Sequence, residues 1–210
     1  MNKPKLIIIY DTYCGWCYGA APIFDALVDA DVELEVLHRH LFQGMHSYKL
    51  ADGKGELILK ADATIASLTG QVFSQKYIDN VVLSKHEVLF SSYSAQAAAL
   101  MHGRGVEAEF AIRRRLESAR YIDGVSAMDR GAVVEALKKE GVTSLQAERI
   151  GTPELVKRAD EIASRALYLM RLVGSKGVPT LIKVKGNSLE LLDHTSCYGN
   201  LGNIAALINQ

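Results

Sequence analysis

The spacing of apolar residues changes several times along the chain, and each change predicts a different element. Leu6 to Tyr10 form a short, continuously apolar run, which is typical of a strand covered on both faces. Helical spacing follows Cys17 and predicts one buried stripe, made of Ala20, Ile23, Phe24, Leu27 and Val28. Pro22 falls inside this helix and should kink it. The alternation of Val32, Leu34 and Val36 with glutamates then predicts a half-buried strand. The chain therefore opens as strand, helix, strand.

Helical periodicity continues from about residue 53 to residue 173. One predicted apolar face consists of Ile65, Leu68, Val72 and Phe73, and another of Leu155, Ala159, Ile162, Ala166 and Met170. The last helix has clear end signals, with Thr152 as N-cap, Pro153 in the first position and Gly174 beyond the end. This region is predicted to be a helical block.

Strand patterns return after Gly174. Residues 180–184 and 188–192 flank Gly186-Asn187, which predicts a β-hairpin. Apolar residues 201–208 then predict a closing helix, with Thr195 or Ser196 as its cap. The fold class is therefore α/β. Residues 1–52 and 174–210 supply βαβ and ββα halves that together form one sheet, and residues 53–173 are an inserted all-helical domain.

Composition narrows the class of partner. The 210 residues include 24 Lys plus Arg and 24 Asp plus Glu, so no net field attracts nucleic acid or an anionic membrane. The first apolar run is shorter than the roughly seven to fifteen residues of a signal peptide, and none approaches the roughly eighteen of a membrane span. We therefore expect a cytoplasmic protein with neither kind of partner.

The reactive chemistry centres on two of the three cysteines. In a reducing compartment, a close pair such as Cys14 and Cys17 is redox-active or metal-binding rather than structural. At a strand-to-helix junction, two thiols separated by two residues approach closely enough to form a disulfide. Cys14 would lie at the helix N-terminus, where free N–H groups and the macrodipole favour a thiolate nucleophile. Cys17 lies deeper and would resolve the mixed disulfide.

Two stretches carry a resemblance to a known family. Residues 10–19, YDTYCGWCYG, together with Gly177-Val178-Pro179-Thr180, resemble the DsbA family of thioredoxin-fold oxidoreductases, and in particular its unexported, FrnE-like branch of predicted disulfide isomerases. The resemblance implies a thioredoxin-like fold with a helical insertion. It also implies that Pro179 is cis and faces the cysteines, and that the Val178 backbone pairs with an extended substrate segment.

The sequence departs from the wider thioredoxin pattern in two ways. The position that holds a buried carboxylate in many relatives is Ile8, so the nearest carboxylate is Asp11, which acts either as a proton relay or as a cap of the active-site turn. No histidine separates the cysteines, which favours a reductase or isomerase over an oxidase. Trp16 would shield the thiols and contact substrate, and Gly15 and Tyr13 would support the site.

Other reactive or charged residues have more than one interpretation. The hairpin would bring Cys197 near the site, either as a third redox thiol or as a buried, inert one. His38 and His40 would share a strand face near His46, but no carboxylate stands at ligand spacing, so we expect no metal site. Arg113 to Arg115 point to different faces of a helix and are expected to be solvated.

These observations favour a thiol–disulfide oxidoreductase that acts on protein or small-thiol substrates. We expect no bound cofactor, with glutathione or a dithiol as co-substrate. One alternative is a glutathione-dependent isomerase or transferase of the kappa-class type, although these relatives usually carry serine in place of Cys14 and lack the second cysteine. The other is a non-catalytic module in which the two cysteines and a histidine hold a metal ion.

Overall fold

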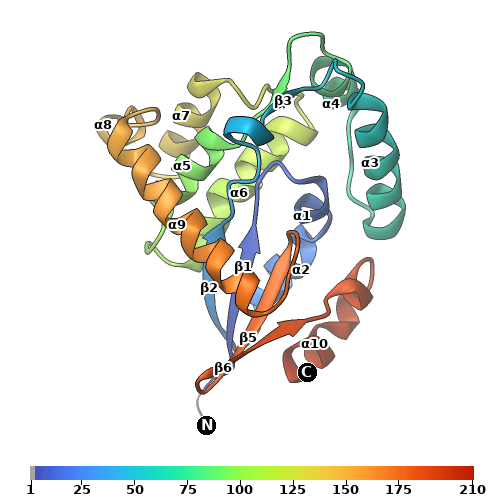
Figure 1. Cartoon of the computed structure of the whole chain (residues 1–210), viewed down its shortest axis with the longest axis vertical. Helices are drawn as coiled ribbons and strands as arrows, with labels where there is room; N and C mark the ends of the chain where they lie inside the picture. The colour runs from blue at the N-terminus through green and yellow to red at the C-terminus, as the bar shows by residue number, and fades with distance from the viewer. Residues whose placement is uncertain (1–2) are drawn as a thin grey trace.

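A four-stranded sheet forms the centre of the computed structural model, which describes residues 3–210. Its strand order is β2-β1-β5-β6, with β1 parallel to β2 and antiparallel to β5 (Figure 1). The strands span Lys5–Tyr10 (β1), Glu33–His38 (β2), Thr180–Lys185 (β5) and Ser188–Leu192 (β6). The N-terminal and C-terminal parts of the chain therefore share one sheet, as the sequence predicted.

Helices cover both faces of this sheet. Leu6 and Ile8 of β1 pack towards α2 (Ala21–Val28) and α10 (Ile204–Asn209), whereas Ile7 and Ile9 pack towards α9 (Pro153–Leu172). Figure 1 shows α9 crossing in front of the strands and α2 behind them. Burial on both faces explains why β1 is apolar at successive positions rather than at alternate ones.

The segment between β2 and β5 is mostly helical, but it also contains a small second sheet. In that sheet β3 pairs antiparallel with β4, a feature that the helical pattern did not indicate. The elements are η1 (Gly44–His46), β3 (Tyr48–Lys49), α3 (Gly55–Thr69), α4 (Gln75–Tyr77), the π-helix η2 (Ile78–Val82), β4 (Val88–Leu89), α5 (Ser92–Met101), α6 (Val106–Tyr121), α7 (Arg130–Lys139) and α8 (Ser144–Ala147).

Helix α9 belongs to two cores at once. Leu155 and Ala159 pack among the apolar residues of α5, α6 and α7, whereas Ala166 and Met170 pack on the sheet. Its predicted N-cap is confirmed, because the side chain of Thr152 accepts a hydrogen bond from Leu155 N.

Two predicted helices are interrupted. The helix after Cys14 breaks at Ala20 into α1 (Gly15–Gly19) and α2, so Pro22 falls in the first turn of α2, where a missing N–H costs no helical bond. The prediction that the closing helix begins after a cap at Thr195 or Ser196 is wrong, because α10 begins only at Ile204. Two short 3₁₀ turns, η3 (Thr195–Cys197) and η4 (Leu201–Asn203), precede α10. Gly199 between them has φ +68°, and a Cβ there would collide with the Leu68 carbonyl oxygen.

The apolar face predicted for α3 is also only partly correct. Ile65 is buried, but Leu68 and Val72 are at least half exposed. The helix ends at Thr69 because Gly70 adopts the left-handed conformation, with φ +75°. Val72 and Phe73 therefore lie beyond the helix.

Arg113 is buried, which contradicts its predicted solvation. Its side chain is 0% exposed, and its Nη1 and Nη2 donate to Glu117 at 2.8 Å and Asp25 at 2.6 Å. The guanidinium also lies 4.7 Å from the centre of the Phe110 ring. Burial raises the pKa of Glu117 to about 7, and the charge of Arg113 opposes that rise. This cluster ties α6 to α2.

Replacing Arg113 by leucine should therefore destabilise the protein by about 3–5 kcal/mol, because Glu117 loses its buried partner. Arg114→Leu provides a matched control. Arg114 also binds Asp25, at 3.0 Å, but its side chain is 41% exposed, so we expect a loss below about 1 kcal/mol. Urea unfolding of both variants measures the difference, and equal losses would contradict a structural role for the buried pair.

Candidate active site

The cysteine pair lies where β1 gives way to α1. The turn that joins β1 to α1 is closed by a hydrogen bond of 3.1 Å from Cys14 N to the Asp11 carbonyl. Cys14 is the extended N-cap residue of α1 and is half-buried, whereas Cys17 is 0% exposed. Both are free thiols, and they therefore have different access to a substrate.

The loop before β5 faces the outer thiol. Cys14 Sγ donates a hydrogen bond to the Val178 carbonyl over 3.7 Å, and the Val178–Pro179 peptide bond is cis. The structure thus brings Val178 and Pro179 beside Cys14, in the geometry that the resemblance implied.

The inner thiol is held in its protonated form. Asp11 N donates a hydrogen bond to Cys17 Sγ at 3.5 Å. Burial raises the pKa of Cys17 well above its ordinary value, and the neighbouring thiol of Cys14 raises it further. Cys17 therefore keeps its proton in the reduced protein at neutral pH.

Asp11 acts as a cap of the active-site turn. Its carboxylate is fully buried and accepts hydrogen bonds from Tyr13 N at 2.8 Å and from Leu41 N at 2.7 Å. This capping role is one of the two that the sequence allowed. The proton-relay role stays a prediction, and the Asp11 charge contributes to the raised pKa of Cys17.

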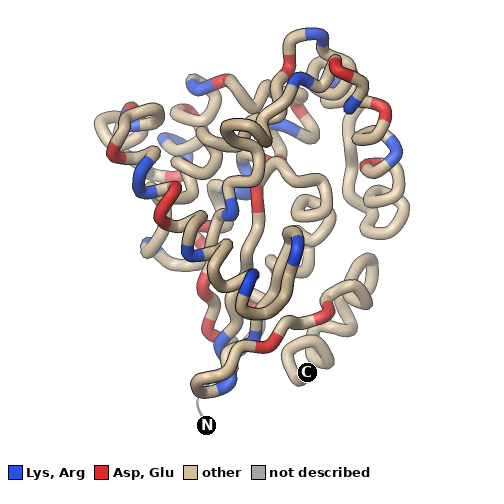
Figure 2. Tube along the Cα trace, viewed as in Figure 1, with Lys and Arg blue, Asp and Glu red and all other residues tan. Residues whose placement is uncertain are grey.

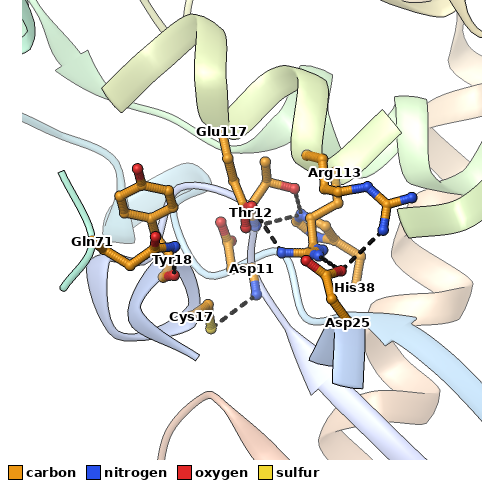
Figure 3. A network of polar contacts seen from close by, with 10 residues as sticks. Asp11, Thr12, Cys17, Tyr18, Asp25, His38, Gln71, Arg113 and Glu117 are labelled. Carbon is orange, nitrogen blue, oxygen red and sulfur yellow. Dashed lines mark hydrogen bonds and ion pairs between the residues drawn. The ribbon is translucent and has the colours of Figure 1, made fainter. Parts of the chain in front are cut away.

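His38 supports the same turn from β2. Figure 3 shows its ring beside Thr12, with Nε2 3.2 Å from Thr12 Oγ1, and its Nδ1 accepts the His40 N–H at 3.1 Å. Thr12 N also donates to Nε2, at 3.2 Å, so both ring nitrogens face backbone N–H donors, and this arrangement favours the neutral ring over the charged one. Burial lowers the pKa of His38 to about 4. The predicted shared strand face is wrong, because β2 ends at His38 and His40 has φ +58°.

Two aromatic side chains stand at the mouth of the site. Trp16 is 37% exposed, and its ring centre lies 5.8 Å from that of Tyr198. Burial raises the pKa of Tyr198, and its hydroxyl donates to the carbonyl of Trp16, the residue before Cys17, at 3.5 Å. Tyr198 gave no signal in the sequence, whereas the adjacent Cys197 was predicted to lie near the site. Cys197 is buried in the same apolar cluster as the pair.

A cavity of about 120 Å³ separates the pair from the helical insertion. Its walls include six aromatic side chains, those of Tyr13, Trp16, Phe42, Tyr48, Tyr77 and Tyr121. Tyr13 and Gly15, both expected to support the site, line it. A Cβ on Gly15 would lie 2.9 Å from Asp62 Oδ1, so the close approach of Asp62 requires glycine there.

Asp62 is a buried carboxylate that the sequence analysis did not identify. It lies on α3, is 6% exposed and accepts a hydrogen bond from the Tyr77 hydroxyl at 3.0 Å. Burial raises its pKa to about 6, while the Tyr77 bond and the Arg120 charge oppose the rise. Ile8, at the position that holds a carboxylate in many relatives, is buried and apolar. The insertion therefore supplies a carboxylate beside Gly15.

Two further observations limit the site's chemistry. Within residues 3–210, no group of three or more His, Cys, Asp or Glu side chains is placed to hold a metal ion. Over the same residues, no helix combines the length and apolar character needed to cross a bilayer.

Comparison with known proteins identifies the architecture. No protein-family model and no curated protein matches the sequence. Among solved structures, the cytosolic disulfide reductase DsbM from Pseudomonas aeruginosa superposes with a TM-score of 0.84 at 24% identity, covering 98% of this chain and 97% of that one. The chain has the DsbA-type fold. The same reductase solved with GSH gives a TM-score of 0.80.

Two more distant structures share this DsbA-type fold. A protein from Nitrosomonas europaea, described as a candidate disulfide isomerase, gives a TM-score of 0.79 at 16% identity over 99% of this chain and 97% of that one. A DsbA-type oxidoreductase from Streptomyces coelicolor gives 0.65 at 15% identity over 97% and 90%. The fold match extends over the helical insertion as well as the sheet.

The neutral state of His38 predicts a loss of stability in acid. Because the folded-state pKa is lowered from 6.5 to about 4, the unfolded chain takes up this proton first as the pH falls. The contribution of His38 is complete above pH 6.5 and is lost as the pH falls towards 4, by on the order of 3 kcal/mol.

Comparison with His38→Asn isolates this effect, since asparagine keeps an acceptor for His40 N but does not titrate. Asp62 and Glu117 have raised pKa values, so their contribution to stability increases as the pH falls. Both proteins contain these two acids, so their contribution cancels in the comparison. The unfolding free energy should therefore decrease more between pH 7.5 and pH 4.5 in the unsubstituted protein than in His38→Asn. Parallel pH profiles would contradict the neutral assignment.

Proposed function

We propose that this protein is a thiol–disulfide oxidoreductase in which Cys14 is the nucleophile and Cys17 the resolving thiol. The observation that carries the proposal is the placing of Cys14. Its sulfur lies at the N-terminus of α1 and against the Val178 carbonyl, with Cys17 buried behind it. A sulfur at the start of a helix faces unpaired backbone N–H groups, which is a typical position for a nucleophilic cysteine.

The reaction proceeds by two exchanges. The Cys14 thiolate attacks one sulfur of a substrate disulfide, forms a mixed disulfide and releases the other substrate sulfur as a thiolate, which takes up a proton. Cys17 then loses its proton and attacks Cys14 Sγ, which releases the second substrate thiolate. Two electrons pass from the cysteine pair to the substrate, and a disulfide joins Cys14 to Cys17. An external dithiol or glutathione reduces that disulfide again.

The surroundings of the pair support net reduction or isomerisation. The residues between the cysteines are Gly15 and Trp16, neither of which places a positive charge beside the Cys14 thiolate. The structurally similar DsbM is a cytosolic disulfide reductase and was solved with GSH, which supports a cytoplasmic location and glutathione as a co-substrate here.

Substrates are proposed to be small or protein disulfides that approach in an extended form. The Val178 carbonyl lies beside Cys14, just before β5, where an extended segment can pair with it in the manner of strand addition. Figure 2 shows acidic and basic positions interspersed along the chain. This distribution supports recognition through local contacts and the thiol rather than through a large field of one sign.

Cys14→Ser should abolish reduction of insulin by the protein in the presence of glutathione, because serine cannot form the mixed disulfide. Cys17→Ser should instead accumulate a mixed disulfide between Cys14 and substrate, visible by non-reducing electrophoresis and mass spectrometry. Cys197→Ser is the matched control for a buried thiol outside the proposed exchange, and it should retain activity. Full activity of Cys14→Ser would refute the mechanism.

A further inference from the structure

Two residues in the wall of the cavity between the cysteine pair and the insertion carry buried polar groups that lack hydrogen-bond partners. It is bounded by Gly15 and Trp16 of the active-site motif on one side and by α3 and α6 on the other. The Tyr121 hydroxyl and Arg120 Nε are buried and have no hydrogen-bond partner within residues 3–210. Unsatisfied buried groups of this kind are costly and rare in folded proteins, and a ligand that binds both relieves the cost.

The charges around the cavity have separate positions. Asp62 Oδ2 is engaged by the Tyr77 hydroxyl, whereas Oδ1 lies against Gly15 and accepts no hydrogen bond from the described residues. Arg120 Nη1 donates to Glu87 at 2.9 Å, and both of those side chains are buried. The Arg120–Glu87 pair is therefore internally balanced, so the cavity presents a carboxylate at Asp62 and two neutralised or neutral donors at Arg120 Nε and Tyr121.

We propose that this cavity is a subsite for the zwitterionic head group of an α-amino acid, so that the preferred small substrates are amino-acid disulfides such as cystine. Asp62 Oδ1 would accept from the ammonium group, which the surrounding aromatic rings also favour. Arg120 Nε and the Tyr121 hydroxyl would donate to the carboxylate. The inference rests on the proposed function and names its substrate class.

The size of the cavity supports one head group rather than a larger ligand. Its volume of about 120 Å³ corresponds to roughly four water molecules. Pockets that enclose a whole drug-sized ligand occupy roughly 300–1,000 Å³. Gly15 and Trp16, the two residues that follow Cys14, line the cavity, so a head group held there lies next to the turn that carries the reactive sulfur. In cystine the Cα that carries the ammonium and carboxylate groups is only two bonds from the sulfur, which suits a subsite beside the cysteine turn.

The chemistry of the bound substrate is the exchange described above. Cys14 attacks one sulfur of cystine and one cysteine leaves as its thiolate, which is then protonated. Cys17 displaces the second cysteine, and the protein is left with the Cys14–Cys17 disulfide. Each cystine is thereby reduced to two cysteines by the two electrons of the pair, and an added dithiol restores the reduced protein.

A panel of four small disulfides tests the subsite. Cystine carries both charged groups, cystamine only the ammonium, dithiodipropionate only the carboxylate, and hydroxyethyl disulfide neither. Pre-reduced protein is mixed with each in a single turnover, and the rate of thiol loss is divided by the rate of the same disulfide with free dithiothreitol. This division removes differences in intrinsic reactivity. Cystine should then exceed hydroxyethyl disulfide by at least about tenfold.

Two conservative variants assign the contacts. Asp62→Asn should lower the normalised rates of reduction of cystine and cystamine by about tenfold relative to those of the other two disulfides, because it removes the charge that binds the ammonium. Tyr121→Phe should slow cystine and dithiodipropionate relative to the other two. It removes only an unpartnered hydroxyl, so the fold should keep its stability. Asp29→Asn, an exposed acid at the far end of α2, is the control for loss of one negative charge.

The outcomes separate the two proposals. The subsite is supported if cystine is preferred, if Asp62→Asn slows only the disulfides that carry an ammonium group, and if Tyr121→Phe slows only those that carry a carboxylate. Equal normalised rates for all four disulfides would overturn it while leaving the proposed function intact, and so would a preference that follows only one of the two charged groups. If no disulfide oxidises the pair in the unsubstituted protein, the proposed function itself is wrong.

Discussion

The active site depends on one buried carboxylate that joins the ends of two parallel strands. Asp11 follows β1, and its two oxygens bind the backbone of Tyr13, in the cysteine turn, and of Leu41, beyond β2. Hydrogen bonds to an ionised acceptor are stronger than neutral ones, and burial protects them from competing water. The turn that presents Cys14 and the segment that carries Phe42 into the cavity wall are therefore held at a fixed separation.

The helical insertion contributes chemistry as well as bulk. The sheet and its flanking helices supply the thiols and the Val178 carbonyl, whereas α3 and α6 supply Asp62, Arg120 and Tyr121. A boundary drawn along the sequence near residue 53 therefore separates segments that meet again at one cavity.

The sequence predicted the elements whose formation depends on residues close together along the chain. The continuous run of β1, the hairpin of β5 and β6, the caps of α9 and the cysteine pair were all predicted, because each depends on neighbouring residues. Asp62 was missed because an acid on a mixed helical face gives no sign that a tyrosine will bury it. Arg113 was misjudged because its partner Asp25 is 88 residues away. The break at Gly199 depends on a carbonyl of α3 and has no local signal either.

Helix α9 joins the two parts of the molecule mechanically. It spans twenty residues, about 30 Å, and its two halves are embedded in different cores. A helix is a cooperative unit, so melting one half removes the hydrogen-bonded support of the other. The sheet and the insertion are therefore coupled in unfolding, and a fragment cut after residue 173 would expose the apolar face formed by Ala166, Leu169 and Met170. The insertion, and with it the cavity wall that it supplies, is in this way stabilised by the same helix that covers the sheet.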